Sequence, residues 1–232
     1  MREPGPLLAS GRDSDIFEYG EGLVLRRSRG GHSLSVEARV MEYVRDHGFP
    51  APKVHELSDD ETELVMERVD GPTMLEVLGA RPWSIRRMGF VLGTLHNSLH
   101  DIPGPEWVRP SPVGAGAQLI HLDLHPGNVL ISPVGPVVID WANVARGDGN
   151  ADAALSWLLM SAGTVETSPT KAALLELSRS RLIKAFLKRF DRSKVARQLP
   201  SVVAWKLTDP NMSDVEQEAM RSLLAKELFS KG

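Results

Sequence analysis

The stretch that decides the fold is LIHLDLHPGNVLISPVGPVVIDW, residues 119–141, in which charged and polar groups interrupt apolar runs. His121, Asp123 and Asn128 form an H-x-D-x4-N pattern, and Asp140 closes the last apolar run. A phosphoryl-transfer site, a histidine-rich metal site and ordinary loop chemistry each predict a pattern of this kind. The choice among them depends on which side chains the surrounding sequence supports.

The phosphoryl-transfer interpretation uses the oxygen-bearing side chains of this stretch. Such a reaction needs a carboxylate that orients or deprotonates the acceptor hydroxyl, and oxygen ligands for the Mg²⁺ on the nucleotide phosphates. Asp123 suits the first task, while Asn128 and Asp140 offer the hard oxygen donors that Mg²⁺ prefers. The apolar runs 129–132 and 137–140 predict a two-stranded hairpin, which returns Asp140 to the neighbourhood of Asn128.

Two other interpretations use the same residues differently. A metallohydrolase would use His121, Asp123 and His125 as zinc ligands. Such a site normally needs further histidines in other loops, and the rest of the chain supplies only those of earlier helix-like or strand-like segments, His32, His47, His55, His96 and His100. The loop interpretation rests on Pro126-Gly127-Asn128, which is good turn material in its own right. Both stay open as alternatives, and the phosphoryl-transfer hypothesis uses more of the polar groups.

The composition limits the classes of protein to which the chain can belong. Its 232 residues, 42% hydrophobic and 25% charged, predict a globular protein with a substantial core. A net charge of −3 argues against a broad nucleic-acid or anionic-membrane surface, and the lack of cysteine excludes disulfides and a cysteine nucleophile. The most apolar helical run, residues 153–165, is too short to span a bilayer, and the first residues lack a signal-peptide pattern. We therefore expect a cytoplasmic protein.

Hydrophobic periodicity divides the chain into a strand-rich part and a helix-rich part. The first part predicts one helix near residues 34–47 and four strands, at 15–20, 22–27, 53–57 and 63–69. The second part opens with a long amphipathic helix, residues 84–100, and stays mostly helical after the hairpin. We expect an α+β protein of two lobes with a cleft between them, divided into residues 1–69 and 70–232.

Several segments together resemble the aminoglycoside phosphotransferase and choline kinase-like family, which is related to the protein kinases. The resemblance rests on HLDLHPGNVL and VVIDWANVARGDGNADAA, and extends to VEARVMEYVRDHGFPAP, LVMERVDGPTM and LGTLHNSLHDIP. It covers about residues 8–159, whereas the last 70 or so residues are only helical. It implies a bilobal protein-kinase-like fold, with an N-terminal nucleotide-binding lobe and a C-terminal catalytic and substrate-binding lobe.

The resemblance also implies roles for the residues of the opening stretch. Asp123 becomes the catalytic base or hydroxyl-orienting group, Asn128 and Asp140 become Mg²⁺ ligands, and His121 holds the loop through hydrogen bonds. Leu122 stands where the family usually has glycine. The following G-D-x-x-x-D motif contributes Asp148, a substrate contact or a helix N-cap, and Asp152, a structural group at the helix start.

The nucleotide site implied by the resemblance lies in the first lobe. Val24 covers the base, and Arg26 meets the phosphates where kinases carry a lysine. Glu37 turns inward to pair with Arg26. The alternative for Arg26 is a solvated position at the end of a strand, and the alternative for Glu37 is an exposed carboxylate on the helix. The remaining contacts come from the turn at Ser10 and Gly11, which equally fits a plain turn, and from the hinge residues Met66, Glu67 and Val69.

Together these features predict an enzyme that uses ATP or GTP with Mg²⁺ to phosphorylate a hydroxyl of a small molecule. Such a molecule would be an antibiotic, such as an aminoglycoside in a resistance role, or an amino-alcohol metabolite. Because the usual lysine is missing, the alternative is a catalytically weak, kinase-like nucleotide-binding protein. Acidic residues near helix ends, Asp101, Asp148 and Asp191, suit an ammonium group on the acceptor, although such residues are usually solvated. Neither a nucleic-acid nor a membrane partner is expected.

Overall fold

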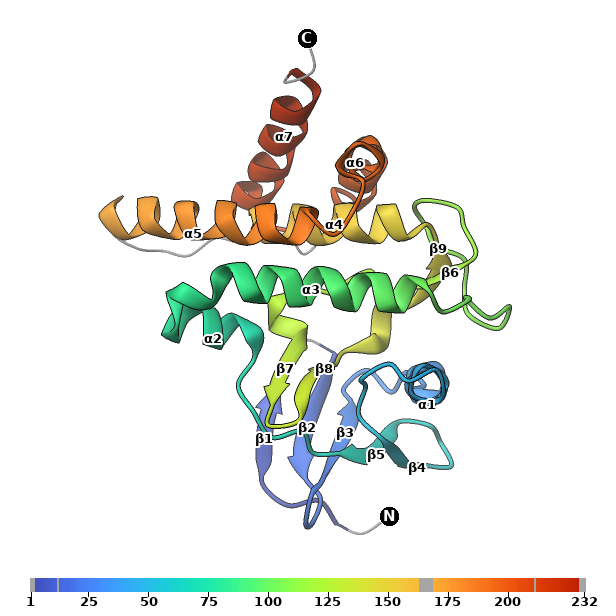
Figure 1. The fold of residues 1–232 in the computed structure, drawn as a ribbon. Coiled ribbons are helices and arrows are strands. Elements are labelled where there is room, and N and C mark those ends of the chain that lie inside the picture. Colours follow the sequence, from blue (N-terminus) through green and yellow to red (C-terminus); the bar gives the residue numbers. More distant parts are fainter. Residues whose placement is uncertain (1–2, 12, 163–168, 211, 230–232) are drawn as a thin grey trace. The chain divides into compact units, whose positions relative to one another are not determined.

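The computed structural model describes residues 3–11, 13–162, 169–210 and 212–229 (Figure 1). The chain forms two compact units, each built from two segments that alternate along the sequence. The first unit contains residues 1–73 and 128–144, and the second contains 74–127 and 145–232. The hairpin of the opening stretch therefore belongs to the first unit, while the loop that carries Asp123 belongs to the second.

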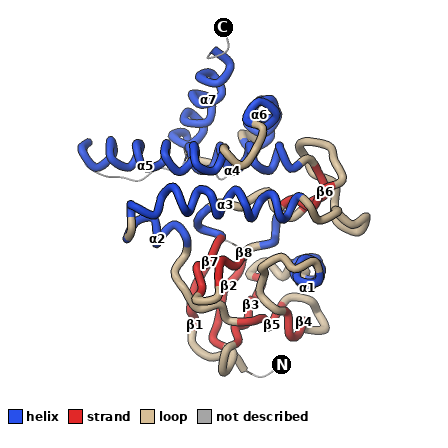
Figure 2. Tube along the Cα trace, viewed as in Figure 1, coloured by secondary structure: helices blue, strands red, loops and turns tan. Residues whose placement is uncertain are grey.

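A five-stranded antiparallel sheet forms the first unit, in the order β1-β2-β3-β5-β4 (Figure 2). Its strands are β1 (Leu7–Ser10), β2 (Ser14–Glu18), β3 (Leu23–Ser28), β4 (Val54–Leu57) and β5 (Glu63–Glu67). The predicted hairpin of β2 and β3 is confirmed, and Gly20 and Gly22 turn it with positive φ angles of 84° and 69°. Tyr19, Leu25 and Val65 are buried on one face of the sheet, where β-branched and aromatic residues stabilise the strands.

The helix of the first unit, α1 (Ser35–Asp46), confirms the predicted apolar periodicity. Val40 and Val44 are fully buried, whereas Val36, in the first turn, is exposed. Glu37 lies on the buried side, although a carboxylate is rarely buried without a partner. The helix ends at Asp46, and Gly48 follows with a φ of 77° and donates its N–H to the carbonyl of Arg45.

The second stretch of the first unit is the predicted hairpin, formed by β7 (Val129–Ser132) and β8 (Gly135–Val138). The chain after β5 lies against it. Ile131 N–H donates to the carbonyl of Pro72 at 2.8 Å, and a Cβ added to Gly71 would stand 2.3 Å from the carbonyl oxygen of Ile131. Only glycine permits this approach, so the segment that leaves β5 holds the hairpin in the first unit.

The second unit is mostly helical. Its helices are α2 (Met74–Ala80), α3 (Ile85–His100), α4 (Gly149–Ala162), α5 (Pro169–Leu187), α6 (Arg192–Lys206) and α7 (Asp214–Phe229). A two-stranded sheet joins β6 (Gln118–Ile120) to β9 (Ala145–Gly147), and the short 3-10 turn η1 (Pro82–Ser84) lies between α2 and α3. A second turn, η2 (Pro126–Asn128), leads from this unit into the hairpin, and η3 (Trp141–Asn143) belongs to the first unit. β6 and β9 flank the sequence motif and lead into its loop and into α4.

Close helix packing builds the core of the second unit. The predicted stripe of α3 is buried as expected, at Ile85, Met88, Leu92, Leu95 and Leu99. A Cβ on Gly89 would stand 2.6 Å from the carbonyl of Leu182, so this glycine lets α3 and α5 approach closely. The apolar run that begins at residue 153 forms the buried part of α4, and its last three residues, 163–165, lie outside the described residues. None of the helices described is long and apolar enough to cross a membrane.

Candidate active site

The site in the first unit centres on Arg26, which β3 places in a buried position. Its Nη1 lies 2.7 Å from Oε2 of Glu37, and its Nη2 lies 3.5 Å from Oδ1 of Asp140. The predicted pairing of Arg26 and Glu37 is therefore confirmed, and neither residue is a solvated surface group. Nε of Arg26 is also buried and has no hydrogen-bond partner among the described residues. A buried donor without a partner is costly, so this atom can accommodate an incoming acceptor such as a phosphate oxygen.

The ionisation of Glu37 reflects its burial. Removal from water raises the pKa of Glu37 to about 7, because the buried site disfavours the charged carboxylate. The guanidinium of Arg26 acts in the opposite direction, while the negative charges of Asp140 and Asp13 add to the increase in this pKa. The ion pair is thus poised to change its charge near neutral pH.

The hairpin brings the two proposed metal ligands to one end. Val129 pairs with Val138, and beyond that pair Ile139 N–H donates to the carbonyl of Asn128 at 3.0 Å. Asp140 follows with φ 65° and ψ 68°, a left-handed conformation that is rare for a residue other than glycine and clusters at functional sites. Its side chain is 45% exposed, so its oxygens are open to a ligand. An amide oxygen and a carboxylate oxygen are both ligands that suit a hard cation such as Mg²⁺.

The strained turn at Asp140 is held by the aromatic residue that follows it. Trp141 is fully buried, and its Nε1–H donates to the carbonyl of Val138 at 3.2 Å. Its ring meets Phe49 edge-on, with the centroids 5.8 Å apart. Such aromatic pairs contribute roughly 0.5–1.5 kcal/mol beyond their buried area. This packing offsets part of the backbone strain at Asp140.

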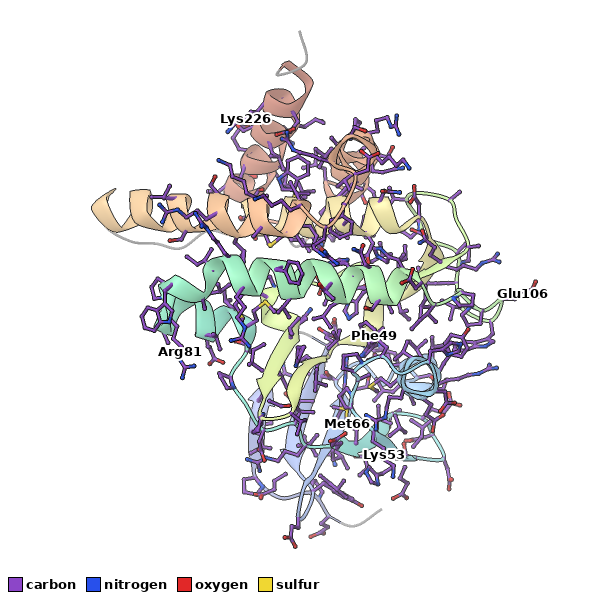
Figure 3. All side chains as sticks on the ribbon, in the orientation of Figure 1. Phe49, Lys53, Met66, Arg81, Glu106 and Lys226 are labelled. Atoms are coloured by element: carbon purple, nitrogen blue, oxygen red, sulfur yellow. The ribbon has the colours of Figure 1, made fainter. Side chains whose placement is uncertain are left out.

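The other predicted nucleotide contacts also lie in the first unit. Val24 is buried and pairs with Met66 across β3 and β5, and Arg26 lies two residues further along β3. Figure 3 labels Met66 in this unit. Glu67 closes β5 and exchanges hydrogen bonds with Lys53, and Val69 follows it. Ser10 and Gly11 form a tight turn between β1 and β2, in which Gly11 N–H donates to the carbonyl of Ser14 at 2.9 Å and Ser10 Oγ donates to Asp15 at 2.6 Å. The contact of these residues with a nucleotide stays a prediction.

In the second unit, the loop after β6 presents Asp123, whose side chain is 27% exposed. Nδ1 of His125 accepts the N–H of Gly127 at 3.0 Å, so a neutral His125 carries its hydrogen on Nε2. That nitrogen lies 3.7 Å from Oδ1 of Asp123, slightly beyond a direct hydrogen bond. His125 therefore neighbours the carboxylate, and a small movement would let it donate to Asp123.

The backbone on the N-terminal side of Asp123 is fixed by Asp152, which is fully buried in α4. Oδ1 of Asp152 accepts the N–H of Leu122 at 2.8 Å, and Oδ2 accepts the N–H of His121 at 3.3 Å. Leu122 itself is buried and has a φ of 60°. Asp152 was expected to act only as a structural group at the start of a helix. The structure shows that its carboxylate also orders the loop before Asp123.

Two histidines of α3 complete this buried network. Nε2 of His100 donates to Oδ2 of Asp152 at 2.9 Å, and Nδ1 of His96 lies 3.3 Å from the same oxygen. Nε2 of His96 lies 3.1 Å from the carbonyl of Leu124, so the network holds the loop on both sides of Asp123. Sequence reasoning missed this function, although two histidines four residues apart on an apolar helix face were the available signal.

The protonation of the network follows from burial and hydrogen bonding. Burial alone would raise the pKa of Asp152, but the hydrogen bonds and charges of His100 and His96 hold that pKa well below its usual range. Burial lowers the pKa of His100, and its contact with Asp152 opposes that shift. Asp152 is thus an ionised acceptor, which strengthens its hydrogen bonds to the loop N–H groups.

The metal-site alternative finds little support in this geometry. Among the described residues, the side chains gathered within metal-ligand distance are His96, His100 and Asp152, not His121, Asp123 and His125. Both oxygens of Asp152 already accept hydrogen bonds from the loop. Asp148, the other aspartate of its motif, caps α4 by accepting the N–H of Asn150 at 2.8 Å and also accepts from the side chain of Gln198.

Solved structures share this fold over nearly the whole chain. The ADP-bound aminoglycoside phosphotransferase APH(2'')-Ib is 14% identical, with a TM-score of 0.60 over 96% of this chain and 92% of its own. A choline/ethanolamine kinase family protein from Mesorhizobium loti is 16% identical, with a TM-score of 0.58 over 97% and 87%. An aminoglycoside-3'-phosphotransferase of type VIII is 21% identical, with a TM-score of 0.59 over 97% and 92%. No curated protein sequence matches the chain.

These likenesses define the class of protein as an α+β protein with a protein-kinase-like fold. The sequence itself defines the family more closely. Residues 5–116 and 107–195 match the phosphotransferase enzyme family, APH, so most of the chain is covered. The chain belongs to this family of kinase-like phosphotransferases.

Proposed function

We propose that this protein is an ATP-dependent phosphotransferase that moves the γ-phosphate to a hydroxyl of a small molecule. The observation that carries the proposal is the position of Arg26, which lies buried between Glu37 and Asp140. Kinase-like phosphoryl transfer needs a cation for the phosphates, a carboxylate that orients this cation and a nearby carboxylate for the metal. Membership of the phosphotransferase family supports the same reaction class.

The nucleotide would bind to the first unit. Arg26 would grip the phosphates, using a guanidinium fork where a lysine would offer a single ammonium group. Val24 and Met66, neighbours across two strands, would cover the base, with the backbone of Glu67 and Val69 as its hydrogen-bond partners. Ser10 and Gly11 would contact the phosphates from the turn between β1 and β2. Residues 1–69 would then form most of the nucleotide-binding lobe, and 70–232 the catalytic and substrate-binding lobe.

Mg²⁺ would be held by the side chains of Asn128 and Asp140, two residues that the β7–β8 hairpin brings to the same end. When bound, Mg²⁺ would neutralise the negative charge that develops on the phosphates during transfer. The contact between Arg26 and Asp140 then has a second use. It keeps a buried cation 3.5 Å from the proposed metal carboxylate and so holds that carboxylate in position for Mg²⁺.

Asp123 would orient the acceptor hydroxyl and accept its proton. The acceptor oxygen forms a bond to the γ-phosphorus, the bond from that phosphorus to the β–γ bridging oxygen breaks, and ADP leaves. Asp152 supports this step by fixing the backbone of Leu122, the residue before Asp123. His125 would hold the far side of the carboxylate through the hydrogen on Nε2.

The acceptor belongs to the class of small molecules. Solved relatives include APH(4)-Ia in a complex with hygromycin B, APH(2'')-IIa in a complex with streptomycin, and an amicoumacin kinase with AMP-PNP. Hygromycin B, streptomycin and amicoumacin are antibiotics, and each relative is at most 15% identical to this chain. An antibiotic or an amino alcohol is therefore the first choice for the acceptor, with resistance as the corresponding biological role.

A two-stage assay tests the proposal. Thermal shift with ATP or GTP, each with and without Mg²⁺, reports nucleotide binding, and a γ-phosphate transfer screen over antibiotics and amino alcohols reports turnover. We expect binding and transfer, and an Asp123→Asn protein should bind nucleotide normally but turn over about 10²–10⁴-fold more slowly, as for loss of a general base. Binding without transfer to any acceptor would instead identify a kinase-like nucleotide-binding protein, the alternative suggested by arginine at position 26.

A further inference from the structure

A groove of about 910 Å³ lies in the second unit, among α4, α5 and α7. α4 packs against both other helices and contributes Trp157 and Ser161 to the groove. The size falls within the range of pockets that hold small organic ligands, about 300–1,000 Å³. None of the residues given a role in phosphoryl transfer lines this groove.

The charges of the groove are one-sided. Its charged lining residues are five cations and one carboxylate, namely Arg179, Lys184, Lys188, Arg192 and Lys226 against Glu227. The chain as a whole has more acidic residues, 30, than Lys and Arg, 27, so the excess of cations is local. Clefts lined by one sign of charge concentrate ligands of the opposite sign. The groove therefore favours an anion.

Most of these cations are available to a ligand. Glu227 is used by Arg192, whose Nη2 lies 2.8 Å from both carboxylate oxygens. The ammonium groups of Lys184, Lys188 and Lys226 have no hydrogen-bond or ion-pair partner among the described residues, and Lys226 projects from α7 (Figure 3). Three unpaired ammonium groups offer a ligand several donors, and none of them is neutralised by a neighbouring described carboxylate.

The lining between the cations is apolar and hydroxylated. Trp157 lies under the guanidinium of Arg192, which stands 5.4 Å from its ring centroid, a cation–π distance. The apolar part of the lining consists of Ile183, Leu187, Phe190, Ala219 and Leu223. Three hydroxyl groups come from Ser161, Ser180 and Ser222. A ligand that matches this lining has an apolar or aromatic body and an anionic group.

We propose that the groove among α4, α5 and α7 is a second ligand site, which binds a small organic anion with an apolar body. The site differs from that of phosphoryl transfer because it uses another face of α4. Ser156 donates to the carbonyl of Leu124 in the loop of Asp123, whereas Trp157 and Ser161, one helical turn apart, line the groove. A phosphate and a carboxylate share the required chemistry, and binding here extends the recognition of anions beyond the nucleotide.

Calorimetric titration of the full chain tests the site with three matched probes: naphthyl phosphate, naphthoate and the uncharged naphthalenemethanol. We expect the two anions to bind, with affinity that falls in high salt, and the uncharged probe to bind at least tenfold more weakly than the better anion. Comparison of naphthyl phosphate with naphthoate shows which anionic group the groove prefers. Inorganic phosphate alone should bind more weakly than naphthyl phosphate, because it lacks the apolar body.

A matched pair of variants assigns the binding to the groove. Lys184→Gln with Lys188→Gln removes two lining cations and should weaken anion binding about tenfold. Arg86→Gln with Arg87→Gln removes the same charge from exposed positions of α3 and should leave it unchanged. The proposal is wrong if both pairs behave alike, if naphthalenemethanol binds as tightly as the anions, or if the wild type binds no anion at millimolar concentration. Asp123→Asn should not alter anion binding, so this result is independent of the proposed catalysis.

Discussion

The carboxylate of Asp152 accepts the N–H of Leu122 at 2.8 Å and so fixes the residue before the proposed catalytic group. Leu122 has a φ of 60°, a conformation that costs a residue with a Cβ about 1–2 kcal/mol. A hydrogen bond to a charged acceptor contributes roughly 1.5–3 kcal/mol. The bond to Asp152 can therefore hold Leu122 in its strained conformation.

His100→Ala should impair catalysis through this network. The variant leaves Oδ2 of Asp152 without one of its buried donors, which costs roughly 1–3 kcal/mol of stability. We expect a lower kcat with little change in KM for ATP, because the loop of Asp123 loosens while the first unit is untouched. Urea unfolding and steady-state kinetics measure the two effects. Asn97→Ala removes an exposed hydrogen bond of the same helix and serves as the control; equal loss of kcat in both variants would refute the assignment.

Leu122→Gly should separate strain from packing. Glycine adopts a positive φ freely and relieves about 1–2 kcal/mol, but the buried leucine side chain contributes roughly 1.5–3 kcal/mol and its removal also leaves a cavity. Packing therefore wins, and we expect a net loss of stability on chemical denaturation. The kcat of the folded variant should stay within severalfold of wild type because the backbone geometry is retained. An increase in stability would show that strain dominates at this position.

Arg26→Gln should reduce kcat/KM for ATP at least 100-fold, because it removes the cation proposed for the phosphates and leaves Glu37 unpaired. Arg26→Lys should have an intermediate effect. A single ammonium group can contact Glu37 but cannot also extend a second nitrogen to Asp140 as the guanidinium fork does. Steady-state kinetics at saturating acceptor compare the variants. Full activity of Arg26→Gln would exclude Arg26 from phosphate binding.

The ion pair also predicts a dependence of stability on pH. The pKa of Glu37 is about 7 in the folded protein and 4.5 for an unperturbed glutamate. An acid with a raised pKa costs no stability below the unfolded value, and the cost grows between pH 4.5 and about 7 and is then constant. It reaches about 3 kcal/mol as an order of magnitude. Relative to wild type, Glu37→Gln should become more stable by this amount between acid and mildly alkaline pH, as measured by urea unfolding; a constant difference would contradict the raised pKa.

Asp140→Asn should raise the Mg²⁺ concentration needed for half-maximal activity by about 10–100-fold, because the amide keeps an oxygen but loses the charge that attracts the cation. Binding of ATP without Mg²⁺ should change little. Titration of activity with Mg²⁺ at fixed ATP measures the effect. Asp59→Asn changes an exposed aspartate in the turn between β4 and β5 and provides a control of equal charge. An unaltered Mg²⁺ requirement would remove Asp140 from the metal site.

Local periodicity predicted those elements whose burial follows a regular pattern. The stripe of α3 reports a single buried face, so residue spacing was sufficient there. The burial of β2, β3 and β5 does not alternate, and these strands were predicted from their apolar, β-branched and aromatic residues. β1 was missed because all four of its residues are exposed at the edge of the sheet and have no buried face to mark them. β6 and β9 are three residues each, too short for any period to appear.

The parts of the candidate site that were predictable are those that depend on the identity of particular side chains in the motif. The β7–β8 hairpin forms as its apolar runs predicted and returns the chain to Asn128, and Arg26 pairs with Glu37 as the resemblance implied. The network around Asp152 was not predictable in this way. It joins α3, α4 and the loop through backbone N–H groups, which every residue type has, and only the tertiary fold selects which of them a buried carboxylate meets.

The alternation of the chain between its two units has a consequence for synthesis on the ribosome. The sheet is encoded by the first 73 residues, but the hairpin held by Gly71 and Pro72 is encoded only by residues 128–144. In a nascent chain, more than fifty residues of the second unit are therefore synthesised between the sheet and the hairpin that completes the first unit. The proposed magnesium ligands belong to the last part of the first unit to be made, so an incomplete chain that ends before residue 128 would carry Arg26 and Glu37 but neither proposed metal ligand.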